Sequence, residues 1–258
     1  MHALSARDNI LYNGQIALDK GVTDLKATYK DNFWEGLPIE RMQVTKEEDR
    51  PEASKNENFE RAETKATKAI QKHSMNINGI ERNSQMDEAY LLLGKTRYYD
   101  QRFVPALEAF NYVLYKSPTS DKILEARIWR EKTNIRLRNV ELAIDNLTPL
   151  ARALFQNNTF YSQANATLAD AYINLKQLDS AAFYIKRAAL KEPKRKNKAS
   201  LNMWSLRAHA RTFARKDDIF KDAWWFVRLG VNQVCQVVRK ILPYNMTYLV
   251  DPKPNKPP

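Results

Sequence analysis

Two 34-residue segments of this sequence, residues 87–120 and 162–195, place the same kinds of residue at the same positions. Small residues occupy positions 8 and 20 of both segments, and a proline occupies position 32. These residues are Gly94, Ala106 and Pro118 in the first segment and Ala169, Ala181 and Pro193 in the second. Small side chains allow two helices to cross closely, and proline ends a helix because it lacks a backbone N–H donor. The sequence therefore predicts helical hairpins that bury their apolar faces by stacking on one another.

The spacing of these residues is typical of a tetratricopeptide repeat. In the first segment, Phe110 stands where a bulky side chain fills the space between the two helices, and residues 100–102 make the turn. A more divergent unit, residues 124–157, lies between the two segments and has Ala143 at position 20. We therefore predict an all-α fold. It is a tetratricopeptide-repeat α-solenoid of stacked helical hairpins over residues 58–193, followed by a divergent C-terminal segment.

Two helical patterns precede these units. Residues 58–72 have an amphipathic face, which predicts the second helix of an earlier pair. Residues 6–20 and 22–29 also have helical patterns, and these are separated at Gly21. Because glycine is a weak helix former, we predict a separate N-terminal helical hairpin in residues 1–31, broken near Gly21.

The segment between these patterns, residues 32–57, is predicted to be an ordered connection that is not part of the repeats. Its first part, residues 32–51, contains two prolines and has no helical period. It also contains Phe33, Trp34 and Leu37, and this apolar content is too high for a free linker. We therefore expect the connection to pack on the repeats.

The net charge of +12 comes from the C-terminal part of the chain. Residues 1–185 contain 25 Lys and Arg and 25 Asp and Glu, whereas residues 186–258 contain 17 and 5. The sequence pI of 9.6 therefore reflects the C-terminal part and does not describe the surface of the repeats. Within this part, residues 194–250 form a divergent basic segment with partly helical spacing, and residues 251–258 are expected to be disordered.

Three interpretations fit residues 194–250: a divergent repeat, a frame error in a gene prediction, or a basic binding patch. The strongest signal for a binding patch is a stripe of arginines at helical spacing near Trp204, formed by Arg207, Arg211 and Arg215. Arginine side chains neutralise phosphates and aromatic rings stack on bases, so the stripe is compatible with nucleic-acid binding. We favour a solvated helix face or a translation artefact over this function.

Residues for catalysis or metal binding form no recognisable pattern in this sequence. The single cysteine, Cys235, excludes a cysteine-based zinc site, and the histidines His2, His73 and His209 are far apart. Walker loops, nucleophile-elbow motifs and HExxH motifs do not occur. The apolar runs are far shorter than the roughly 20 residues that a membrane-spanning helix needs. We therefore expect no enzymatic activity, no small-molecule substrate, no cofactor and no bound metal.

The candidate functional site is the groove that the first helices of the hairpins line in a tetratricopeptide array. Projecting the three units onto this geometry places seven residues in the groove: Lys95, Tyr98, Tyr99, Lys132, Arg136, Asp170 and Asn174. Three cations beside two tyrosines suit a partner protein with an acidic or carboxylate-ended segment. Two alternatives are that another part of the chain packs into the groove and that water fills it. If the groove binds a partner, the double substitution Lys132→Glu and Arg136→Glu is expected to abolish binding.

Much of the chain resembles one family. The stretches that carry the resemblance are ILYNGQIALDKG (10–21), DNFWEGLPIERMQ (31–43), KATKAIQKHSM (65–75) and DEAYLLLGKTRYYDQRFVPALEAFNYVLYKSP (87–118). They are similar to the N-terminal part of the SprE/PorW family, the tetratricopeptide lipoproteins of Bacteroidota gliding motility and type IX secretion. The likeness covers residues 2–193 and includes the non-repeat segment around Trp34. It implies that the chain is an N-terminal fragment of a longer scaffold whose partners are other components of the secretion machinery.

The family also implies a location on the periplasmic side of the outer membrane, through an acylated cysteine that follows a lipoprotein signal. This sequence contains neither feature. Membrane association is therefore expected only through a lipid anchor that this chain lacks, and a cytoplasmic protein is expected if Met1 is the true start. The alternative function is accordingly a cytoplasmic tetratricopeptide adaptor that binds peptides.

Overall fold

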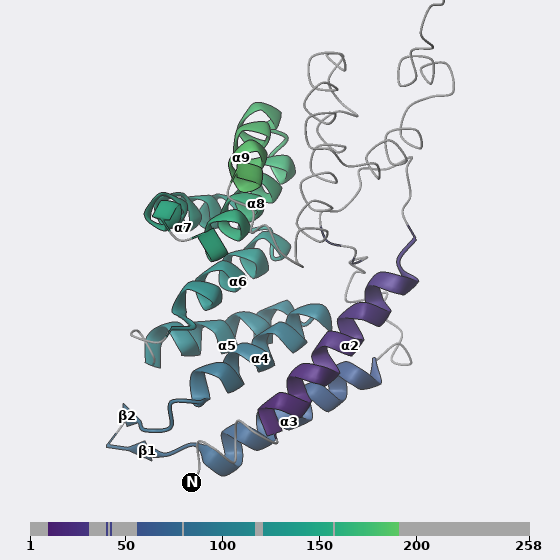
Figure 1. The fold of residues 1–258 in the computed structure, drawn as a ribbon, viewed down its shortest axis with the longest axis vertical. Helices are drawn as coiled ribbons and strands as arrows, with labels where there is room; N and C mark the ends of the chain where they lie inside the picture. Colours follow the sequence, from purple (N-terminus) through teal and green to yellow (C-terminus); the bar gives the residue numbers. More distant parts are fainter. Residues whose placement is uncertain are drawn as a thin grey trace, which may run out of the picture.

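The computed structural model describes residues 10–30, 40, 42, 56–78, 80–116, 121–156 and 158–190 (Figure 1). Within these residues the protein is almost entirely helical. The α-helices are α2 (Tyr12–Thr28), α3 (Glu57–His73), α4 (Met86–Tyr99), α5 (Phe103–Lys116), α6 (Ile123–Arg136), α7 (Val140–Ala153), α8 (Asn158–Asn174) and α9 (Leu178–Leu190). A 3₁₀-helix, η4 (Leu154–Gln156), follows α7. Most of the predicted connection 32–57 and both C-terminal segments, 194–250 and 251–258, lie outside the described residues.

The helices form a stack of hairpins. Consecutive helices pack against each other from α2 to α9, and alternate helices also contact each other, α2 with α4, α4 with α6 and α6 with α8. Figure 1 shows the hairpins following one another along the molecule, with the direction of the helices turning from the α2–α3 pair to the α8–α9 pair. We call α2, α4, α6 and α8 the first helices of the hairpins and α3, α5, α7 and α9 the second helices. The predicted all-α fold of stacked helical hairpins is confirmed.

The turns inside three of the hairpins have the same geometry. One residue in each turn has a positive φ: Gln101 at 60°, Arg138 at 66° and Lys176 at 61°. The next backbone N–H then donates to a carbonyl five residues earlier, at 2.8 Å, 2.9 Å and 2.9 Å in chain order. This is the hydrogen bond of a Schellman helix end. Five residues after each positive φ comes a fully buried alanine on the second helix, Ala106, Ala143 or Ala181.

These turns provide a test of backbone strain. A left-handed conformation costs a residue with a side chain about 1–2 kcal/mol, and glycine avoids this cost but loses more entropy on folding. Gln101→Gly, Arg138→Gly and Lys176→Gly are therefore each expected to raise the free energy of unfolding by about 0.5–1 kcal/mol. Urea denaturation measures the change. Glu108→Gly, at an exposed position within α5, is the control and is expected to destabilise the protein.

Close helix crossing within a hairpin is clearest between α4 and α5. Phe110 of α5 is fully buried, and a Cβ atom added to Gly94 of α4 would lie 2.5 Å from its ring. Tyr98 and Val113 join Phe110 in a core that also includes Ala126 of α6. The core therefore continues from one hairpin to the next, as stacking requires.

The first hairpin differs from the prediction. We expected residues 1–31 to form a hairpin broken near Gly21, and this is wrong, because α2 runs through Gly21 without interruption. The glycine is needed there for close packing, since a Cβ atom would lie 2.5 Å from the ring of Phe59 on α3. The partner of α2 is therefore α3, which is the predicted helix 58–72. The connection 32–57 consequently falls between the two helices of the first hairpin.

A short β-hairpin between α3 and α4 was not predicted. Strands β1 (Asn76–Ile77) and β2 (Ile80–Glu81) pair antiparallel, and Asn78 has a φ of 53°. The Glu81 carboxylate accepts hydrogen bonds from the Ser74 hydroxyl at 2.5 Å and from the Met75 backbone N–H at 2.8 Å. An Asn-Gly pair between two isoleucines is a recognised hairpin signal, so this β-hairpin could have been predicted from the sequence.

Candidate functional site

The seven predicted groove residues lie on three successive first helices. Lys95, Tyr98 and Tyr99 are on α4, Lys132 and Arg136 are on α6, and Asp170 and Asn174 are on α8. These three helices contact one another in order, so the residues occupy one continuous face. Those from α4 and α6 meet around two residues that were not predicted, Trp129 and Glu40.

Trp129 of α6 forms an aromatic wall of the site. Its ring centroid lies 5.3 Å from that of Tyr98 and 5.7 Å from that of Tyr99, both edge to face. The Nζ atoms of Lys132 and Lys95 lie 4.4 Å and 5.7 Å from the tryptophan ring. Tryptophan is the aromatic side chain that attracts cations most strongly. Helical spacing from Lys132 and Arg136 would have placed Trp129 on this face, so its position was available from the sequence.

Glu40 supplies a carboxylate to this cluster. Its Oε2 atom accepts hydrogen bonds from the Tyr98 hydroxyl at 2.8 Å and from the Arg136 guanidinium at 3.4 Å. Its Oε1 atom accepts one from Lys132 Nζ at 2.7 Å. Arg136 Nε also donates to the Tyr98 hydroxyl oxygen at 3.1 Å, which links all three donors. Sequence reasoning missed Glu40, because a residue in a segment without a helical period gives no spacing to project.

Glu40 and Met42 belong to the predicted connection 32–57, and both are buried on the stack. Glu40 is 8% exposed and Met42 is 2% exposed. Met42 packs in the same core as Tyr98 and Phe110. At these two residues, the connection contacts the side chains of α4 and α6.

Two opposing effects set the ionisation of this cluster. Burial disfavours the charged forms, and the attraction between opposite charges favours them. Burial alone would raise the pKa of Glu40, but Lys132 and Arg136 lower it to about 2. Burial would lower the pKa of Arg136, but Tyr98, Asp170 and Glu40 raise it above its usual range. Glu40 is therefore an anion and Arg136 a cation at neutral pH. Burial raises the pKa of Tyr98 well above its usual value, so this hydroxyl keeps its proton and donates a hydrogen bond to Glu40.

The remaining predicted residues lie at the edges of this cluster. Lys95 Nζ is 2.6 Å from the Glu125 carboxylate of α6, so this pair joins two first helices. Asp170 lies close enough to Arg136 to affect its pKa, which brings α8 into the same electrostatic network. Asn174 is exposed, and its side-chain amide donates to the Asp170 carbonyl at 2.8 Å. The predicted residues thus run from a cluster on α4 and α6 that already holds the Glu40 carboxylate to the exposed Asn174 on α8.

Comparison with known proteins adds no function to this geometry. Models of known protein families do not match the chain, and a search of curated protein sequences finds no significant match. In the part of the chain that the structure describes, no helix is both long enough and apolar enough to cross a membrane. The same residues contain no group of three His, Cys, Asp or Glu side chains arranged to hold a metal ion.

Proposed function

We propose that the protein is a non-enzymatic scaffold for protein–protein interaction, and that the first-helix face binds acidic segments of its partners. The observation that carries this proposal is the way Tyr98, Lys132 and Arg136 hold the carboxylate of Glu40. Three donors from two helices converge on one carboxylate beside an aromatic wall. Charge-assisted hydrogen bonds and buried aromatic side chains are the contacts that anchor peptide segments at interfaces.

The proposal includes tetratricopeptide-type repeats as the scaffold. Two features support this assignment: the shared turn geometry at Gln101, Arg138 and Lys176, and the close crossing of Gly94 against Phe110. Both occur at the positions that the 34-residue spacing specifies. Stacks of such hairpins present long surfaces that suit extended partners.

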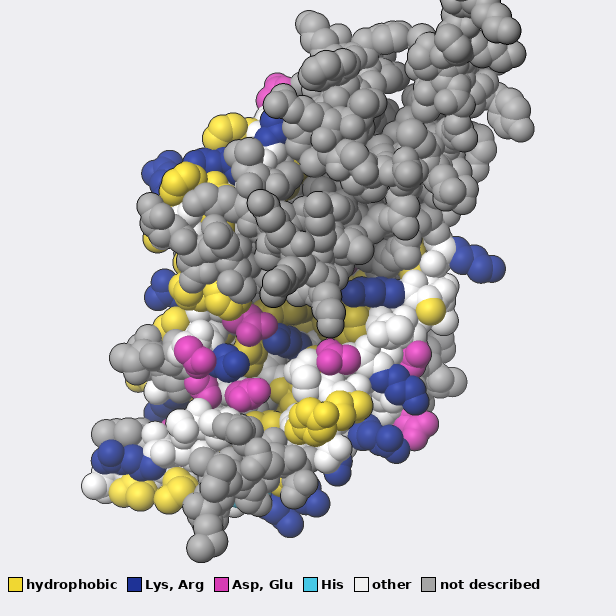
Figure 2. Space-filling model, viewed as in Figure 1, with side chains coloured by type: hydrophobic (Ala, Val, Ile, Leu, Met, Phe, Trp, Pro, Cys, Tyr) yellow, Lys and Arg dark blue, Asp and Glu magenta, His cyan; other side chains and the backbone are white. Residues whose placement is uncertain are grey.

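We place this scaffold in the type IX secretion and gliding machinery, on the periplasmic side of the outer membrane. This rests on the resemblance of residues 2–193 to the SprE/PorW family, including the segment around Trp34. The surface of the described repeats is compatible with a protein partner. Figure 2 shows Lys and Arg side chains interspersed with Asp and Glu side chains on the visible face, rather than gathered in one basic field.

Photo-crosslinking tests this function with the full chain in a gliding Bacteroidota cell. A benzophenone amino acid replaces Asn174, which is exposed on the first-helix face, or Glu108, which is exposed on the second helix α5. We expect adducts with a secretion-machinery protein from position 174 and few from position 108. Equal adducts from both positions, or adducts only from position 108, would refute binding through the first-helix face.

The contacts of Glu40 determine which substitution can usefully be combined with the crosslinking amino acid at position 174. Reversing Lys132 and Arg136 to glutamate would place two more carboxylates beside Glu40, so lost binding would also follow from damage to the fold. Glu40→Gln instead removes an internal competitor for the same donors. We expect it to increase adduct yield at position 174 several-fold at a temperature where circular dichroism shows an intact fold. An unchanged or reduced yield would place the partner's acidic group elsewhere.

A further inference from the structure

The middle hairpin, α6–α7, departs from its neighbours at the point where its helices cross. Position 8 of the 34-residue unit is Gly94 in one neighbour and Ala169 in the other, but it is Glu131 in this hairpin. Glu131 is only 1% exposed. Glycine or alanine brings two helices close together, whereas a glutamate side chain needs space and hydrogen-bond donors.

The hairpin itself supplies the donors for Glu131. Its carboxylate accepts hydrogen bonds from Arg130 Nε at 2.6 Å and from the Asn134 amide at 2.7 Å, both on α6. The Asn146 amide on α7 adds a third at 3.2 Å. The charge of Glu131 is therefore satisfied locally, and the guanidinium of Arg130 is held in a fixed orientation.

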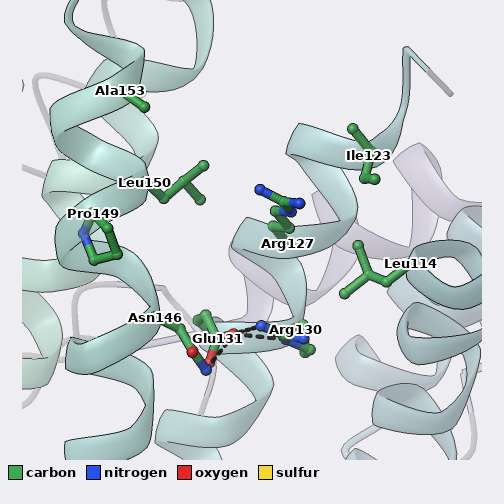
Figure 3. A pocket seen from close by; sticks show the side chains of 9 residues that line it. All are labelled: Leu114, Ile123, Arg127, Arg130, Glu131, Asn146, Pro149, Leu150 and Ala153. Carbon is green, nitrogen blue, oxygen red and sulfur yellow. Dashed lines mark hydrogen bonds and ion pairs between the residues drawn. The ribbon is translucent and has the colours of Figure 1, made fainter. Parts of the chain in front are cut away.

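A cavity of about 450 Å³ lies beside Glu131, between α5, α6 and α7 (Figure 3). Its apolar walls include Leu114 of α5, Ile123 of α6 and Leu150 of α7, and its polar lining includes Arg127, Arg130 and Asn146. The volume falls in the range of pockets that hold small ligands or a few side chains of a partner. Pro149, inside α7, also lines the cavity.

This cavity is separate from the Glu40 cluster on the first-helix face. Successive residues of an α-helix are about 100° apart around its axis. By this spacing, Ile123, Arg127 and Arg130 project from the side of α6 opposite to Lys132 and Arg136. A ligand in the cavity would therefore leave the Glu40 cluster untouched.

We propose that this cavity is a second docking site, which binds a peptide segment that carries a carboxylate next to a bulky apolar side chain. Two arginines and one glutamate line it, which leaves one positive charge to be matched. Within the residues that the structure describes, the Arg127 side chain makes no hydrogen bond or ion pair, and its guanidinium lies in the space between α6 and α7 (Figure 3). Arg130 uses Nε and Nη2 for Glu131, which leaves Nη1 to donate. The leucine and isoleucine walls take the apolar side chain.

Binding of a defined peptide to the purified full chain tests this site. The probe is N-acetyl-Phe-Glu-amide, and N-acetyl-Phe-Gln-amide is its uncharged match. Binding is followed through the side-chain amide resonance of Asn146 in ¹H–¹⁵N NMR spectra. We expect the acidic probe to shift this resonance to saturation and the Gln probe to bind about tenfold more weakly, since one charge-assisted pair is lost.

Two variants distinguish binding in the cavity from binding to basic side chains elsewhere on the surface. Arg127 is exposed, so Arg127→Ala should keep the fold, and we expect it to weaken the acidic probe at least fivefold. Arg152 is an exposed arginine on α7 that does not line the cavity. Arg152→Ala is therefore the control and should leave binding unchanged. Equal affinity for the two probes, no saturating shift at Asn146, or full affinity of Arg127→Ala would each overturn the proposal. None of these results depends on the crosslinking at position 174, so each proposal can be refuted without refuting the other.

Discussion

Glu40→Gln is expected to lower the free energy of unfolding at pH 7 by about 3 kcal/mol. Removing one charge from a buried ionic cluster leaves the remaining charges buried without a counter-ion. Lys132 and Arg136 lose their shared counter-ion, and the Tyr98 hydroxyl loses its acceptor. Urea denaturation measures the change. Glu57→Gln is the matched control, because Glu57 is 88% exposed and lies 4.0 Å from an exposed Arg61. It is expected to change stability by less than about 0.5 kcal/mol.

The pH dependence of stability identifies the electrostatic part of this effect. The folded-state pKa of Glu40 is about 2, below its unfolded value of about 4.5, so its contribution is full above pH 4.5. The contribution is lost as the pH falls from about 4.5 to about 2, and it amounts to roughly 3 kcal/mol at 1.36 kcal/mol per pKa unit. The difference in stability between wild type and Glu40→Gln should therefore shrink over this interval. A difference that stays constant with pH would mean that Glu40 contributes by packing alone.

The parts of the fold that the sequence predicted are the ones built from local, repeated contacts. Gly94 and Phe110 are 16 residues apart in the chain, and their close contact was specified by the small and bulky positions of one unit. The alanines at 106, 143 and 181 follow equivalent turns for the same reason. A repeated unit shows its own spacing, so a pattern seen twice predicts the geometry of both copies.

Glu40 was not predictable in this way. Its contacts with Tyr98, Lys132 and Arg136 span 58, 92 and 96 residues of sequence. They depend on where Glu40 meets two hairpins, and a residue from a stretch of sequence without a helical period cannot be placed by projection. The apolar content of the segment indicated that it would pack on the repeats, but no pattern indicated which residue would carry the charge.

Two other differences arose because one residue type serves two purposes. Gly21 was interpreted as a helix break, yet it allows Phe59 to approach α2 closely within a continuous helix. A single sequence does not distinguish these two uses of glycine. Glu131 was passed over because the middle unit diverges from the pattern. The divergence itself was informative, since a charged residue at a crossing position requires both donors and space.

Phe110→Ala is expected to produce the largest loss of stability among the variants considered, about 3–5 kcal/mol, because a fully buried ring leaves a cavity. Gly94→Ala is expected to cost about 1–3 kcal/mol, even though alanine favours helix, because its Cβ would meet the Phe110 ring. In the Phe110→Ala background the same Cβ enters the vacated space. Gly94→Ala should then be neutral or stabilising, which gives a coupling energy of about 2 kcal/mol or more.

The control for this double-mutant cycle pairs Gly94→Ala with Leu147→Ala. Leu147 is fully buried in the core of the middle hairpin and belongs to a different cluster from Phe110. These two substitutions should add within about 0.5 kcal/mol, because distant sites without shared partners act independently. Equal coupling in both pairs would mean that Gly94→Ala disturbs the whole stack. Coupling confined to Phe110 would instead assign its cost to the α4–α5 crossing, on which the tetratricopeptide assignment of this hairpin depends.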